Sequence, residues 1–134
     1  MKNSIKYLII IPAVLTLAVF SFLGSGTAKA VTTSMPLCEI VRGLAIGSSG
    51  EDVRCLQKYL NWSGFTLAAS GAGSPVNETF YFGARTQAAV KTWQEFHSPS
   101  VLAPLGLTTG TGFWGTYSQN RYVSLVRVAL GLRP

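Results

Sequence analysis

The stretch NETFYFGARTQAAV, residues 77–90, is the most informative part of the sequence for the fold. It passes from polar residues through three consecutive aromatic residues to Gly83, and then into an alanine-rich pattern of helical period. The stretch GTGFWGTYSQNRYV, residues 110–123, has the same order, with Gly115 at the position of Gly83. Aromatic residues followed by a glycine therefore occur twice, each time where a helix is expected to begin.

Each position of this repeat has a structural explanation. Glycine at the start of a helix permits a positive φ or a close approach of other atoms. The hydroxyl of Thr86 or Ser118 lies in the first turn, where it can bond free backbone groups. An aromatic residue just before the helix can hold the incoming chain against the helix's apolar side. We interpret the repeat mainly as a helix-start device, and direct contact with a ligand is the alternative.

Three segments carry apolar residues at helical spacing, at about 50–63, 84–97 and 116–130. Ser48 or Ser49 is the expected N-cap of the first, and Gly64 its expected end. Pro99 ends the second. In the third we expect Tyr122, Leu125, Val126 and Ala129 to face inward, and in the second Ala89, Val90, Trp93 and Phe96.

Two long connectors rich in Gly separate the helices, at residues 65–82 and 98–115. Loops of this length are usually functional or pack on the core themselves. For residues 65–82 we expect packing as a short extended pair. No single helix is long enough to be stable alone in water. The sequence therefore predicts an all-α fold, a small three-helix bundle with two long Gly-rich connectors, after an N-terminal signal peptide.

The start of the chain has the pattern of a secretory signal peptide. Lys2 and Lys6 precede the apolar run of residues 7–23, and a small-x-small ending follows at Ala28 and Ala30. We expect cleavage after Ala30, and an uncleaved membrane anchor is the alternative. The expected organisation is a signal peptide at 1–30, a leader at 31–43 and a helical domain at 44–130.

The charge of the chain does not indicate a nucleic-acid ligand. It has 11 basic and 5 acidic residues and a net charge of +6. Three of the basic residues, Lys2, Lys6 and Lys29, and none of the acids lie in residues 1–30, so the remainder has 8 basic and 5 acidic residues, net +3. A mild positive charge suits a polyanionic surface such as a cell wall, and no nucleic-acid motif occurs.

Both cysteines, Cys38 and Cys55, lie beyond the signal segment. Export permits a disulfide between them. Closing a loop of this size stabilises a domain by roughly 3 kcal/mol on the chain-entropy model. Two free buried thiols are the alternative.

The ordered motifs resemble the peptidoglycan-binding domain-like family over about residues 44–128. The residues that carry the resemblance are Gly47, Gly50, Val53, Leu56, Gln57 and Leu60, then Phe82, Gly83, Thr86, Ala89, Val90, Trp93 and Gln94, then Gly106, Leu107, Gly112, Gly115 and Ser118. The resemblance implies a three-helix domain that binds bacterial cell-wall peptidoglycan, often beside a wall-degrading enzyme. Asn77 and Glu78 stand where many members have Asp-Gly, and the connector around them is longer than the compact family form.

The sequence offers no catalytic constellation. His97, the single histidine, is expected to supply a favourable charge at the end of the second helix. Glu51 and Asp52 suit a helix start, and Glu78 with Glu95 is the only carboxylate pair that could be proposed for glycosidase chemistry. One histidine and two cysteines that can bridge make no zinc site. We predict no enzyme activity, no metal site and no cofactor.

The connectors carry aromatic, amide, carboxylate and guanidinium groups suited to sugar and peptide ligands. The candidate ligand-binding residues are Asn77, Glu78, Thr79, Tyr81, Arg85, Thr111 and Trp114. The structural alternative is that Tyr81 and Trp114 fill the core.

The expected function is that of a secreted or cell-envelope, non-catalytic module that binds peptidoglycan. A cell-wall enzyme is a possible partner, and the membrane is contacted only through an uncleaved signal segment. The alternative is an envelope-exposed structural or protein-interaction domain with the same fold and no glycan binding. A wall hydrolase is the third hypothesis.

Overall fold

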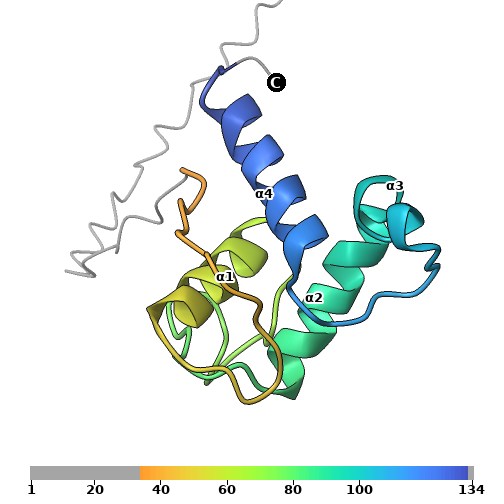
Figure 1. Cartoon of the computed structure of the whole chain (residues 1–134). Helices are drawn as coiled ribbons and strands as arrows, with labels where there is room; N and C mark the ends of the chain where they lie inside the picture. The colour runs from red at the N-terminus through yellow and green to blue at the C-terminus, as the bar shows by residue number, and fades with distance from the viewer. Residues whose placement is uncertain (1–33, 133–134) are drawn as a thin grey trace, which may run out of the picture. The chain divides into compact units, whose positions relative to one another are not determined.

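The computed structural model describes residues 34–132, and these form an all-α fold, as predicted. The elements in chain order are α1 (Glu51–Trp62), α2 (Ala84–Phe96), α3 (Ser98–Val101), the 3-10 helix η1 (Ala103–Leu105) and α4 (Thr116–Ala129) (Figure 1). The predicted signal peptide at 1–30 and the first residues of the predicted leader lie outside the described residues. Among the described helices none is long and apolar enough to cross a bilayer.

The three predicted helices correspond to α1, α2 and α4, but the chain forms a fourth helix between the last two. Pro99 ends α2 as predicted and then lies in the first turn of α3. A proline is tolerated there because the first turn needs no backbone N–H donor. The second connector therefore contains two short helical elements, which place Val101 and Leu102 in the core.

The ends of α1 show one correct and one wrong prediction. Neither predicted serine caps the helix: the N-cap is Gly50, without a side-chain hydrogen bond, and the Ser48 hydroxyl accepts from the N–H of Ala45. Gly64 follows the helix with φ of 91°, and Phe65 N–H donates to the Leu60 carbonyl at 2.8 Å. Glycine is favoured in this left-handed position because it has no Cβ to clash.

The segment before α1 pairs with the residues that precede α2 and with those that precede α4. Leu44 forms an isolated antiparallel bridge with Trp114, and Ser49 forms one with Tyr81. The extended pairing expected within the first connector therefore lies between that connector and the N-terminal segment. Because one segment bridges to the residues before α2 and before α4, it couples the two copies of the repeat.

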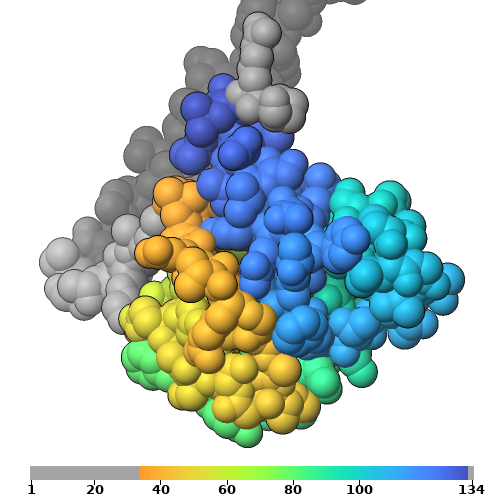
Figure 2. All heavy atoms as spheres, viewed as in Figure 1, coloured from red at the N-terminus to blue at the C-terminus, as the bar shows by residue number. Residues whose placement is uncertain are grey.

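Covalent and polar contacts hold the same segment to α1 and α4. Cys38 and Cys55 form a disulfide, with their Cα atoms 5.6 Å apart, as predicted. The Tyr122 hydroxyl of α4 donates to the Pro36 carbonyl at 2.9 Å and accepts from the Cys38 N–H at 2.6 Å. Figure 2 shows this N-terminal segment, in orange, lying against α4, in blue.

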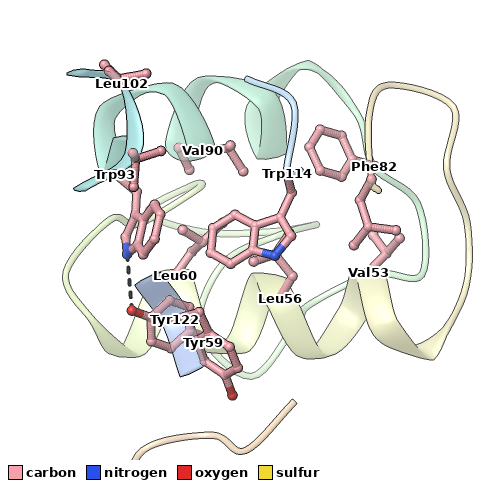
Figure 3. Packing of buried hydrophobic residues seen from close by; sticks show 13 residues of the cluster. Val53, Leu56, Tyr59, Leu60, Phe82, Val90, Trp93, Leu102, Trp114 and Tyr122 are labelled. Atoms are coloured by element: carbon pink, nitrogen blue, oxygen red, sulfur yellow. Dashed lines mark hydrogen bonds between the residues drawn. The ribbon is translucent and has the colours of Figure 1, made fainter. Parts of the chain in front are cut away.

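The core is built around four aromatic rings, from Tyr59, Trp93, Trp114 and Tyr122 (Figure 3). The Trp93 and Trp114 ring centroids are 4.6 Å apart, and those of Tyr59 and Tyr122 are 4.7 Å apart. The Trp93 indole donates to the Tyr59 hydroxyl at 3.1 Å. Aliphatic and aromatic residues surround these rings: Leu44, Val53, Leu56, Leu60, Phe82, Ala89, Val90, Val101 and Leu102.

Two residues predicted to face inward do not. Phe96 is 73% exposed and pairs edge to face with Phe65, at a centroid separation of 5.7 Å. Ala129 is exposed near the end of α4, whose last turns project away from the other helices (Figure 1). Tyr122, Leu125 and Val126 contact the core as predicted. Helical period identifies a stripe, but the length of the neighbouring helices decides how much of the stripe is covered.

His97 does not carry the charge that we predicted for the end of α2. Burial, with a further contribution from the nearby Arg121 charge, lowers its pKa from 6.5 to about 4. Its ring lies 4.5 Å from that of Trp93, and its Nδ1 accepts from the Arg121 guanidinium at 3.3 Å. The imidazole is therefore neutral at pH 7 and acts as an acceptor.

The low pKa of His97 predicts loss of stability in mild acid. Between pH 6.5 and about 4 the unfolded chain binds a proton at His97 that the folded chain does not, so acid favours unfolding. We expect the melting temperature to fall less between pH 7.5 and 4.5 for His97→Gln than for the natural chain. Thermal unfolding followed by circular dichroism measures this, and an identical pH dependence in both proteins would contradict the assignment.

Gly110 is a position where only glycine fits. A Cβ there would overlap the Lys91 carbonyl oxygen and lie 2.7 Å from the Lys91 Cα, both in the backbone of α2. We expect Gly110→Ala to destabilise the fold by about 1–3 kcal/mol, as overpacking typically does. Gly83→Ala is the matched control, because its Cβ would meet only the Tyr81 ring, at 3.5 Å. Urea unfolding of both variants measures the difference, and equal losses would refute the close approach.

Candidate ligand-binding site

A buried glutamine of α1 organises the chain ahead of α2. The Gln57 side-chain amide donates to the Tyr81 carbonyl at 2.9 Å and to the Thr86 hydroxyl at 3.0 Å. Its side-chain oxygen accepts from the Thr79 N–H at 2.7 Å. We call this set, Gln57 with Thr79, Tyr81 and Thr86, the first glutamine clasp.

Gln94 of α2 does the same for the chain ahead of α4. Its amide donates to the Phe113 carbonyl at 2.7 Å and to the Ser118 hydroxyl at 3.1 Å. Its oxygen accepts from the Gly112 N–H at 2.9 Å and from the Thr111 hydroxyl at 3.3 Å. This second glutamine clasp shows that the repeat seen in the sequence is also a repeat of hydrogen-bond geometry.

The clasps change the role of the first-turn hydroxyls. Thr86 and Ser118 were expected to bond backbone groups of their own helices, yet α2 and α4 have no side-chain N-cap hydrogen bond. Their hydroxyls instead accept from Gln57 of α1 and Gln94 of α2, respectively. A buried amide must find partners for its donors and acceptor, and these hydroxyls supply part of them.

The two glycines of the repeat also differ from the expectation of a positive φ. Gly83 and Gly115 have φ of −98° and −101°, which other residues can adopt. The second explanation, a close approach, holds at Gly115, where a Cβ would lie 2.6 Å from the Phe113 ring. Phe82 and Trp114, the aromatic residues directly before the glycines, are fully buried and bring the incoming chain to the core.

The first clasp forms the floor of an open hollow of about 360 Å³, which we call the first hollow. The Tyr81 side chain is 55% exposed at this hollow, and the Arg85 guanidinium donates to the Ala72 carbonyl at 3.2 Å. The lining residues are Gln57, Leu67, Ala72, Gly73, Thr79, Tyr81, Gly83, Ala84, Arg85 and Thr86. The site therefore combines an aromatic ring, a cation and polar groups over a fixed base.

The second clasp underlies another open hollow, also about 360 Å³, which we call the second hollow. It is lined by Gln94, Val101, Leu102, Leu105, Thr111, Phe113, Gly115, Thr116, Tyr117 and Ser118. Two of its walls come from the short helices α3 and η1, which the sequence did not predict.

The structure distributes the predicted ligand-binding residues over different places. Thr79, Tyr81 and Arg85 line the first hollow, and Thr111 lines the second. Asn77 lines neither, and its side chain bonds the Ser74 hydroxyl at 3.1 Å within the connector.

Glu78 also lies outside both linings. Its carboxylate accepts from the Asn61 amide at 2.9 Å, which fastens the connector to the end of α1. Glu95 accepts from the N–H of Gly110 in the other connector. The pair Glu78 and Glu95, considered for glycosidase chemistry, is therefore engaged in holding two separate loops.

Trp114 requires a correction. It was predicted as an aromatic platform for a ligand, but its side chain is 0% exposed and packs against Trp93. The physical reason is its position directly before α4, from which the ring points into the core. The alternative weighed from the sequence, that this tryptophan fills the core, is the correct one. Phe113, one residue earlier, is the exposed aromatic residue.

Several lining residues were not predicted. Gln57 and Gln94 gave a usable signal, because each directly follows a core residue, Leu56 or Trp93, and both are among the residues that carry the family resemblance. Phe113 and Tyr117 match Tyr81 and Arg85 in the same alignment. Leu67 and Ala72 gave no signal in the sequence, because apolar residues in a Gly-rich connector follow no periodic pattern.

The groups that line the two hollows are suited to binding a ligand. Neither lining contains a carboxylate or an imidazole among the described residues. Groups of three His, Cys, Asp or Glu side chains that could hold a metal ion do not occur within 34–132. The groups present can stack on a ring, donate and accept hydrogen bonds, and pair with an anion.

Comparisons with known proteins bear on the first hollow. No curated protein and no solved structure matches the chain. The match found is to a family model, and it covers α1, the first connector, α2 and α3, including every residue that lines the first hollow. Residues 49–101 thus match the family described as "Putative peptidoglycan binding domain", which confirms the resemblance derived from the sequence.

Proposed function

We propose that residues 44–130 form a secreted, non-catalytic module that binds bacterial peptidoglycan through the first hollow. The observation that carries the proposal is the coincidence of two findings: the residues matched by the peptidoglycan-binding family include the whole lining of a hollow that holds an exposed aromatic ring and a guanidinium. Family likeness alone would not identify the binding surface.

The first hollow offers two distinct contacts to such a ligand. The exposed Tyr81 ring supplies a flat surface for the apolar face of a sugar or for a peptide side chain. Arg85 places a guanidinium beside it, and a guanidinium pairs well with the carboxylates of a stem peptide or a muramyl group.

The first clasp prepares the site for binding. Gln57 bonds the backbone of Thr79 and Tyr81, so the loop that carries the ring is held in place before a ligand arrives. Ordering a loop on binding costs affinity, and a loop already fixed avoids that cost.

Two further features support an extracytoplasmic setting. The Cys38–Cys55 disulfide is of a kind that persists in oxidising compartments. The sequence pattern of residues 1–30 is that of a signal peptide, and the net charge of +3 that remains favours a polyanionic wall.

The function predicts that Arg85→Ala and Tyr81→Ala weaken binding to the wall. We expect each to reduce affinity for insoluble purified peptidoglycan by about tenfold, since a charged hydrogen bond or an aromatic anchor is lost. Arg127→Ala is the control, because it removes the same charge from the last turn of α4. Co-sedimentation of the exported chain, its N-terminus read by mass spectrometry, measures the effect.

Four outcomes would count against the proposal. If the natural chain stays in the supernatant at low salt, the alternative of an envelope protein-interaction domain is favoured. If Arg127→Ala weakens sedimentation as much as Arg85→Ala, or if moderate salt abolishes it, the attraction is one of net charge. Release of soluble fragments from the wall would show turnover and revive a hydrolase.

A further inference from the structure

The second hollow repeats the first, position by position. Five pairs of lining residues correspond: Gln57 with Gln94, Thr79 with Thr111, Tyr81 with Phe113, Gly83 with Gly115, and Thr86 with Ser118. The correspondence extends to hydrogen bonds that do not involve the glutamines. The Tyr81 N–H donates to the Thr79 hydroxyl at 3.4 Å, and the Phe113 N–H donates to the Thr111 hydroxyl at 3.1 Å.

The two hollows differ in charge. Tyr117 occupies the position of Arg85, so the lining of the second hollow contains no cation and no anion. The first hollow is lined on one side by the connector residues Leu67, Ala72 and Gly73. The second hollow has Val101, Leu102 and Leu105 in their place. The second hollow therefore keeps the polar floor and the exposed ring of the first, and exchanges its cation for a second aromatic ring.

We propose that the second hollow is a second subsite of the same module, and that it takes an uncharged N-acetylated sugar ring. The assignment rests on the proposed function for its biological ligand, and it gives the two hollows different parts of that ligand. Eight of the ten lining residues of the second hollow, from Leu102 to Ser118, lie beyond residues 49–101, so the family match does not assign this hollow.

The absence of charge in the lining selects the class of ligand. A carboxylate seated there would lose water and gain no cation, which is costly. A neutral pyranose has apolar C–H faces for the rings of Phe113 and Tyr117, which are 51% and 39% exposed. Its hydroxyl and acetamido groups can reach the hydroxyls of Thr116 and Tyr117.

The exposed ring of Phe113 is held in place before binding. A Cβ on Gly115 would lie 2.6 Å from this ring, and so would a Cβ on Gly43, so the ring packs closely on both glycines. The carbonyl of Phe113 is bonded by Gln94. An aromatic surface fixed in this way loses little side-chain freedom when a sugar stacks on it.

Peptidoglycan contains both kinds of group, an uncharged N-acetylglucosamine ring and a carboxylate-bearing muramyl peptide. A module with one cationic and one neutral aromatic subsite matches this chemistry. The first hollow is assigned to the charged part through Arg85, and the second to the neutral ring through Phe113 and Tyr117.

A neutral oligomer of N-acetylglucosamine, chitotriose in its fully acetylated form, tests the second subsite. Titration into the exported chain, followed by backbone NMR shifts, should show saturable binding with the largest changes at residues 111–118. We expect Tyr117→Ala to weaken binding by about tenfold. Phe113→Leu, which retains an apolar side chain, should weaken it as well. Arg127→Ala is the control, because Arg127 lies in the last turn of α4 and outside both linings, and it should leave binding unchanged.

The outcomes separate this inference from the proposed function. If chitotriose does not bind, or if Tyr81→Ala weakens it as much as Tyr117→Ala does, the second subsite is overturned while wall co-sedimentation still decides the function. If chitotriose binds through Tyr117 but the chain does not sediment with peptidoglycan, the subsite stands and the proposed function fails. Circular dichroism confirms that each variant is folded.

Discussion

The structure depends on two buried glutamine side chains. Connectors without regular structure leave backbone donors and acceptors unpaired, and burying such groups without partners costs free energy. Gln57 and Gln94 supply those partners from helices that already form the core. Replacing either side chain by an apolar one would leave several loop groups unsatisfied at once, so each glutamine acts on a whole loop.

The clasps also explain why the two hollows resemble each other at the base and differ at the rim. Each floor is set by the same bonds between a glutamine, the loop backbone and a first-turn hydroxyl. Side chains that the clasps do not engage are free to vary, and Arg85 and Tyr117 lie at such a position. A duplicated scaffold can thus present different chemistry without change to its framework.

A second constraint joins the repeats to each other. The segment from Pro36 to Ser49 is bonded to α1 by the disulfide, to α4 by Tyr122, and to both helix starts by single bridges. These contacts span distant parts of the chain, so they depend on the packed core for their geometry. The same segment brings Gly43 beneath the Phe113 ring and so contributes to the second hollow.

From the sequence alone came the all-α class, three helices with ends near the observed residues, and the resemblance of residues 49–101 to a peptidoglycan-binding family, because helical period and glycine positions are local signals. The sequence also favoured the Cys38–Cys55 disulfide over two free thiols, and the structure contains it. The burial of Trp114, the neutral state of His97 and the clasping of the connectors by Gln57 and Gln94 became visible only in the packed fold. These properties follow from which side chains meet across the core. The path of an irregular connector has no period to reveal it in advance.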